Sequence, residues 1–244
     1  MKKILFATAL ATTLGMADFI GGEVNLGYYS HSPSGVAQNG DDKVDIEDDL
    51  KWENEGDVFF KAYFEHPVPI VPNIKIGYSS FSHKGDGVAS KTFSWGDINL
   101  ITVKDKIDTE LDLKMYDITL YYELLDNWLN FDAGLNIKYL DGSIKVDTTT
   151  DHEESSVSVP IPMLYAKARV DIPTTDVSLQ VEGNYISYDS NTLYDLEIGA
   201  RYTFMLGLGI EAGYKTLKLK IDDIDDASID ADFNGIYGKV VWDF

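Results

Sequence analysis

The chain contains no cysteine, so its stability does not rest on disulfides and it has no thiol for a Cys/His zinc site. It is also poor in positive charge: 20 Lys and Arg stand against 41 Asp and Glu. Such acidity argues against nucleic acid as a partner and against tight docking of its soluble parts onto anionic lipid. The chain also lacks a nucleotide-binding glycine loop and the Gly-x-Ser-x-Gly pattern of many hydrolases.

The N-terminus has the features of a secretory signal. Two lysines precede a short uncharged apolar run at 4–14, and a small-x-small cleavage site follows at 15–17. The run is shorter than the ~20 residues that a membrane-spanning helix needs. We therefore predict a signal peptide over 1–17 and a single mature domain over 18–244. Loss of the two lysines leaves 18 basic against 41 acidic residues, a net charge of −23.

Ten segments of the mature chain alternate between apolar and polar residues, which is typical of β-strands. The apolar face of these segments carries no charge, whereas the opposite face carries 11 acidic and 8 basic residues. We predict ten antiparallel strands. Eight or twelve are the alternatives, because 93–104 could form an extra external hairpin. The ten segments are 20–31, 56–66, 73–82, 111–124, 129–146, 156–172, 177–188, 192–204, 208–221 and 232–244.

Alternation alone does not say whether the apolar face points into a soluble barrel or out of a membrane barrel. Three features favour the membrane barrel. Connections alternate between short and long, with 189–192 the exception, apolar-face aromatics gather near both strand ends, and about −20 of the charge falls in loops and chain ends. We therefore predict an all-β, antiparallel, up-and-down transmembrane β-barrel with acidic extracellular loops and both termini in the periplasm. The short connections are 67–72, 125–128, 173–176 and 205–207.

The polar face of such a barrel lines its lumen. A ten-stranded lumen is narrow, so its charged side chains either pair into a network that closes the barrel or line a narrow pore for small solutes. Both interpretations use the same candidate residues. These are Lys61, Lys75, Asp117, Asp132, Lys138, Lys167, Arg169, Glu182, Glu197, Arg201, Glu211, Lys215 and Lys239.

The chain ends in a strand whose apolar face carries Trp242 and Phe244. This ending resembles the C-terminal strand of Gram-negative outer-membrane β-barrels, in which a terminal aromatic helps the assembly machinery to recognise the chain. Together with the Gly21-Gly22 pair and the turn and strand over 125–142, it resembles a family of small Gram-negative outer-membrane β-barrel proteins. The resemblance covers the mature chain. It implies an outer-membrane location, with outer-membrane lipid, lipopolysaccharide and the barrel-assembly machinery as partners, and it implies no assigned activity.

Two groups of residues are candidate sites: the acidic loop residues and the four histidines, of which we expect His66 in the periplasm and His31, His83 and His152 at or above the external rim. His31 precedes Ser32, and His152 precedes an acidic, serine-containing stretch, a pattern that a rim-located hydrolase would need but that arises easily by chance. Carboxylates suit Ca²⁺ or Mg²⁺, but the run 222–226 lacks the glycine turn of an EF-hand. We therefore predict no catalytic residue, no cofactor and only weak cation association. The expected role is structural or surface interaction, ahead of a narrow porin-like channel and a rim hydrolase.

Overall fold

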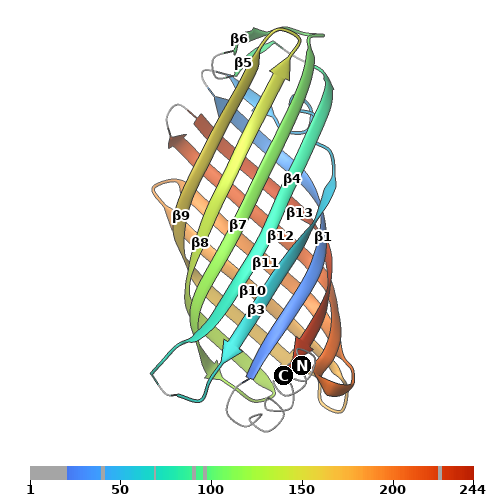
Figure 1. Ribbon diagram of the computed structural model, residues 1–244, viewed down its shortest axis with the longest axis vertical. Coiled ribbons are helices and arrows are strands. Elements are labelled where there is room, and N and C mark those ends of the chain that lie inside the picture. The colour runs from blue at the N-terminus through green and yellow to red at the C-terminus, as the bar shows by residue number, and fades with distance from the viewer. Residues whose placement is uncertain (1–20, 40–41, 69, 90–91, 96–97, 225–226) are drawn as a thin grey trace, which may run out of the picture.

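The computed structural model describes residues 21–39, 42–68, 70–89, 92–95, 98–224 and 227–244. The chain forms a closed barrel of ten antiparallel strands, in which the last strand pairs back onto the first (Figure 1). The predicted fold class and strand number are confirmed. The predicted signal peptide lies outside the described residues. Within the described residues, no helix is long and apolar enough to cross a membrane.

Each of the ten predicted segments falls in one barrel strand, but several strands run further than predicted. The stretches expected as long loops near 83–110 and 140–158 are largely continuations of these strands, because the alternating pattern persists beyond the apolar belt. The longest strands have 20 residues, whereas about 9–11 cross a bilayer. The barrel strands are β1 (Gly21–Asn39), β3 (Glu55–Glu65), β4 (Asn73–Val88), β7 (Lys106–Leu125), β8 (Leu129–Thr148), β9 (His152–Asp171), β10 (Val177–Tyr188), β11 (Asn191–Thr203), β12 (Leu208–Ile224) and β13 (Ala227–Asp243).

Four short elements lie in the connections. β2 (Lys43–Asp45) pairs with the far part of β1, and η1 (Met205–Gly207) is a single 3-10 turn between β11 and β12. β5 (Phe93–Trp95) and β6 (Ile98–Ile101) form the hairpin that left twelve strands open, but they pair with each other and do not join the barrel. We call the end where β1 begins and β13 ends the short-turn end, and the opposite end the long-strand end.

The outward side chains are those of the predicted apolar face. Leu135, midway along this face of β8, has 65% of its surface exposed. Exposed aromatic side chains form two girdles around the apolar belt, one near each end, as predicted. Tyr116 belongs to one of these girdles and was not predicted. A continuous belt of this kind suits hydrocarbon rather than water, and closure of the sheet leaves its backbone paired. The aromatics are Tyr28, Tyr116, Tyr139, Tyr185 and Tyr214 toward the long-strand end, and Phe64, Tyr122, Tyr202, Phe204, Trp242 and Phe244 toward the short-turn end.

The inward face differs from the sequence interpretation in one respect. It was expected to be polar throughout, but only the half nearer the short-turn end is. Toward the long-strand end the interior is an apolar core that includes Phe59, Phe81, Met115 and Phe233. These four residues lie at inward positions of strands that also carry charged side chains at inward positions. The alternation of apolar and polar residues therefore did not show that the interior has an apolar half.

The barrel closes at a contact between Gly22 and Phe244. The backbone N–H of each residue donates to the carbonyl of the other at 2.9 Å. A Cβ atom at Gly22 would lie 2.7 Å from the Tyr63 carbonyl oxygen and 2.8 Å from the Phe244 ring. At Gly21 the nearest atom would be 3.4 Å away. Steric contact therefore excludes a side chain at Gly22 but not at Gly21.

We expect Gly22→Ala to lower the free energy of unfolding by about 1–3 kcal/mol, because the added methyl group overpacks the β1–β13 closure. Gly21→Ala is the matched control, and we expect it to change stability by about 0.5 kcal/mol or less. Urea unfolding from lipid vesicles, followed by tryptophan fluorescence, measures both variants. Equal losses for the two would contradict this account of the closure.

Candidate functional site

The lumen is closed by three layers of paired charges. In the layer nearest the short-turn end, Arg201 on β11 donates to Glu23 at 2.9 and 3.0 Å and to Glu211 at 3.0 Å. Lys167 lies 3.7 Å from the same Glu23 carboxylate. Only 1% of the Arg201 side chain is exposed. Its planar guanidinium suits two carboxylates at once, so it joins β1 to β12, the two strands that flank β13.

The middle layer is built on two glutamates from neighbouring strands. Glu182 on β10 accepts hydrogen bonds from Lys61 at 3.0 Å and from Lys75 at 2.7 Å. Glu197 on β11 accepts from Lys61 at 2.8 Å and from Lys215 at 2.9 Å. Lysines from β3 and β4 therefore meet carboxylates from the opposite wall, across the lumen centre, whereas Lys215 faces Glu197 from the neighbouring strand β12.

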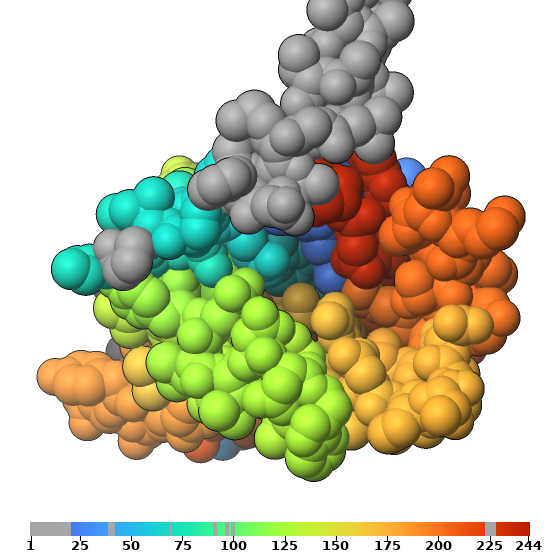
Figure 2. All heavy atoms as spheres, turned by 90° about the horizontal axis from the view of Figure 1, so that it is seen from below, coloured from blue at the N-terminus to red at the C-terminus, as the bar shows by residue number. Residues whose placement is uncertain are grey.

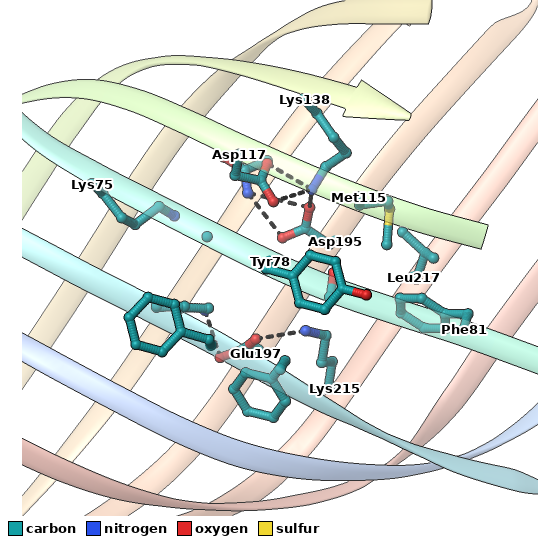
Figure 3. A pocket seen from close by; sticks show the side chains of 16 residues that line it. Lys75, Tyr78, Phe81, Met115, Asp117, Lys138, Asp195, Glu197, Lys215 and Leu217 are labelled. Carbon is teal, nitrogen blue, oxygen red and sulfur yellow. Dashed lines mark hydrogen bonds and ion pairs between the residues drawn. The ribbon is translucent and has the colours of Figure 1, made fainter. Parts of the chain in front are cut away.

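In the third layer Lys138 on β8 lies between two aspartates. It donates to Asp117 at 2.8 Å and lies 3.1 Å from Asp195 (Figure 3). Beside this layer and the middle one is a cavity of about 20 Å³, lined also by Phe81 and Leu217. A cavity needs roughly 10–15 Å³ to hold one water. The space left at this level therefore fits about one water and no larger solute.

The structure places all thirteen predicted lumen residues on the inner side of the wall. Eleven belong to the layers just described, with Lys239 linking Glu211 at 3.0 Å to Glu197 at 3.7 Å. Asp132 and Arg169 instead line the mouth at the short-turn end. That these residues form a paired network that closes the barrel, rather than line a narrow pore, remains a prediction. The eleven are Lys61, Lys75, Asp117, Lys138, Lys167, Glu182, Glu197, Arg201, Glu211, Lys215 and Lys239.

Sequence reasoning missed the tyrosines that complete the network. The Tyr63 hydroxyl donates to Glu182 at 2.8 Å, and the Tyr237 hydroxyl donates to Glu211 at 2.6 Å. The Lys167 ammonium also lies 4.2 Å from the centre of the Tyr63 ring. The alternating pattern predicts that both side chains point inward. It does not predict their partners, which depend on how strands distant in sequence face one another.

Toward the long-strand end the lumen is filled by a cap, which we define as residues 43–52 together with β5 and β6. Val44, Ile46, Leu50 and Trp52 are buried in the same apolar core as the interior of the wall. The backbone N–H of Ile46 donates to Gly35 on β1 at 3.0 Å, which holds the segment against the wall. These residues were expected to be external loop, so the cap was not predicted. The apolar residues within this acidic stretch were the feature of the sequence from which a buried segment could have been predicted.

The histidine clusters that suggested a rim hydrolase are not assembled. His31 and His83 were expected at or above the rim, but both are buried, and His31 points away from the exposed Ser32. His31 Nε2 lies 3.2 Å from the Asp57 carboxylate, and the His83 ring stacks on Trp52 of the cap. A substrate at the rim would have to displace the cap to reach either ring.

The remaining predicted histidines lie far from this core. His152, at the exposed tip of the β8–β9 hairpin, contacts Asp147 rather than a serine. His66 accepts a hydrogen bond from the Val68 backbone N–H at the short-turn end. Neither has a serine partner within the contacts of the described residues.

The short-turn end opens into a vestibule of about 410 Å³. Figure 2 looks onto this end, which is ringed by the turns after β3, β7, β9 and β11 and by the end of β13. Glu65, Glu123 and Asp132 line the vestibule together with Lys167 and Arg169. Because the Arg201 layer lies directly inside it, the vestibule ends blindly.

No group of three or more potential ligands that could hold a metal ion occurs within the described residues. The acidic run at 222–226 lies partly outside them. Weak association of Ca²⁺ or Mg²⁺ with the acidic long-strand end therefore stays a prediction.

No protein-family model matches the chain, and no curated protein matches it. Among solved structures, it is similar to the transport unit of the autotransporter AIDA-I from Escherichia coli, with 8% identity over 91% of this chain and 89% of that one and a TM-score of 0.46. The translocator domain of NalP from Neisseria meningitidis has 9% identity, coverage of 98% and 96%, and a TM-score of 0.46. Ail of Yersinia pestis has 10% identity, coverage of 90% and 97%, and a TM-score of 0.35. These likenesses are weak, and the fold rests on the strand pairing itself.

Proposed function

We propose that the protein is an integral outer-membrane β-barrel with a closed lumen and a structural or surface-interaction role. One observation carries the proposal: the wall is apolar on the outside, while the inside is filled from the Arg201 layer to the cap. An apolar exterior places the barrel in a bilayer. A filled interior removes the route that a porin would offer to solutes.

The energetics favour a lumen that stays closed. Breaking a buried ion pair by removing one partner typically costs about 3–5 kcal/mol. Opening a path would separate several such pairs at once, since Lys61 and Lys75 reach Glu182 and Glu197 on the opposite wall. The cap would have to leave as well. Conduction would therefore require a rearrangement of the whole interior rather than a side-chain movement.

We place the short-turn end in the periplasm and the long-strand end outside the cell. Short periplasmic turns and long external segments are the usual arrangement of outer-membrane barrels. In this orientation Trp242 and Phe244 reach the periplasmic girdle, where the barrel-assembly machinery would meet them, and the acidic long-strand end faces lipopolysaccharide. Sedimentation of the protein with inner rather than outer membranes would reject this location.

Conductance in planar lipid bilayers tests the closed lumen against the narrow channel. We expect the purified barrel to give no stable current steps at protein levels where a general porin, as the positive control, gives many. A variant in which a Gly/Ser linker replaces residues 43–52 should also stay silent, because the charged layers close the lumen independently of the cap. Reproducible steps from the wild type would support the porin-like alternative instead.

A further inference from the structure

Within the described residues, β9 has an edge that is unpaired at the long-strand end. β9 pairs with β8 along its whole length, from His152 to Val170. Its pairing with β10, on the other side, covers only Leu164 to Asp171. Beyond Leu164, no pairing of β9 on that side occurs among the described residues. The pairing stops at Leu164 and Tyr185, three residues before β10 ends at Tyr188, and β9 continues outward beyond that point.

The register shows which residues present backbone groups to this edge. At one end of β9, the Asp171 N–H donates to the Trp128 carbonyl on the β8 side; at the other end, the Thr148 N–H donates to the Asp151 carbonyl. The β8–β9 register runs without a bulge between them. Odd-numbered residues of β9 therefore bond to β8, and even-numbered residues direct N–H and C=O the other way.

Two prolines occupy the even positions nearest the membrane. Pro160 pairs with the girdle residue Tyr139, and Pro162 lies one step deeper. Proline has no N–H, so neither position leaves an unpaired donor where β10 falls away at the edge of the apolar belt. Further out, Ser156 and Ser158 follow at the same parity and retain their N–H groups. The β9 edge therefore has no free N–H donor at Pro160 and Pro162, next to the membrane, but has free donors at Ser156 and Ser158 further out.

The open stretch projects freely. Ser156 lies about 14 Å along the strand from Pro160, at roughly 3.4 Å per residue. Val157 and Val159 point to the inner side of the strand, yet they are 46% and 37% exposed. Both faces and one edge of this part of β9 are therefore accessible. Apolar side chains flank the unpaired backbone groups, as in sheets that accept an added strand.

The surrounding charge selects the partner. The tip of the β8–β9 hairpin carries five acidic residues against a single lysine. A second copy of this chain would bring the same negative edge against it, so self-pairing is disfavoured. An extended segment with basic side chains would add backbone hydrogen bonds and relieve the repulsion. The charged residues are Asp141, Lys145, Asp147, Asp151, Glu153 and Glu154.

From this we infer that the even-numbered edge of β9 at Ser156 and Ser158 is a docking site for a basic, extended peptide segment of another protein. The segment adds to the sheet as a strand beside β9. Backbone groups of β9 supply the hydrogen bonds, and the acidic hairpin supplies the charge preference. This inference rests on the proposed surface-interaction role and names its site and the chemistry of its partner.

The test uses the full mature barrel in zwitterionic detergent micelles and a blocked nine-residue peptide in which lysine and threonine alternate. Fluorescence anisotropy of the labelled peptide gives the affinity. We expect saturable binding that weakens at least tenfold in the double variant Ser156→Pro, Ser158→Pro, which removes two edge N–H groups and leaves the β8 ladder intact. The matched control is Ser156→Ala, Ser158→Ala, which removes the same hydroxyls, including the contact of Ser158 with Tyr139, and should bind as the wild type does.

Three results would overturn the inference. They are equal binding by the proline variant, no saturable binding by the wild type, and equal binding of a peptide with glutamate in place of lysine. If the proline variant does not fold, as judged by circular dichroism, a peptide N-methylated at alternate residues tests the same bonds on the wild type and should lose binding. The failure of this inference is distinguishable from that of the proposed function, because bilayer conductance reports the closed lumen whatever binds at the edge.

Discussion

Replacement of Arg201 by alanine is expected to lower the free energy of unfolding by about 3–5 kcal/mol. The guanidinium is the shared partner of Glu23 and Glu211, and its removal leaves two buried carboxylates short of a counter-charge. Lys239 still reaches Glu211 at 3.0 Å, whereas Glu23 keeps Lys167 at 3.7 Å and the neutral amide of Asn25 at 2.6 Å. The loss therefore comes from uncompensated buried charge rather than from missing contact area. Urea unfolding from lipid vesicles measures it.

Two companion variants separate this cause from a general effect of losing a long side chain. Lys84→Ala removes a lysine that is 68% exposed and paired with Glu110 at 3.2 Å, and we expect a change of about 0.5 kcal/mol or less. The double variant Arg201→Ala, Glu211→Gln should lose less than the sum of its single variants, because one orphaned charge is then neutral. Additive losses would mean that Arg201 acts through packing alone.

The sequence was sufficient to predict the wall of the barrel because the wall obeys local rules. The alternation that places Leu135 outward and Lys138 inward is a property of neighbouring residues, and it persists through every strand. Ten closed strands then follow from ten such segments. The thirteen charged candidates could be assigned to the lumen on the same parity, without knowledge of their partners.

What fills the lumen could not be read in the same way. Arg201 meets Glu23 across 178 positions of sequence, and Lys61 meets Glu197 across 136. Such pairs depend on strand stagger and on which walls face each other, neither of which appears in a local pattern. The cap shows the same limit: Trp52 lies among acidic residues and Trp95 in a stretch expected as external loop, and only the fold shows that both rings are buried.

The exposed belt yields the prediction that tests the membrane setting most directly. We expect Leu135→Arg to lower stability in lipid vesicles by about 2–4 kcal/mol, because it places a cation in the middle of the hydrocarbon region. Leu135 lies between the two girdles of aromatic side chains, four residues from the girdle residue Tyr139. Because 65% of its surface is exposed, the cost would arise chiefly from lipid rather than from protein packing.

Val88→Arg is the matched control. Val88 is 53% exposed at the outer end of β4, beyond the aromatic ring of the long-strand end, and we expect its replacement to cost about 0–1 kcal/mol. In a barrel surrounded by water, an arginine at either exposed position would be tolerated equally well. A large loss at Leu135 and a small one at Val88 therefore separates a membrane belt from a soluble apolar surface. Two equally small effects would remove the basis for placing this wall in a bilayer.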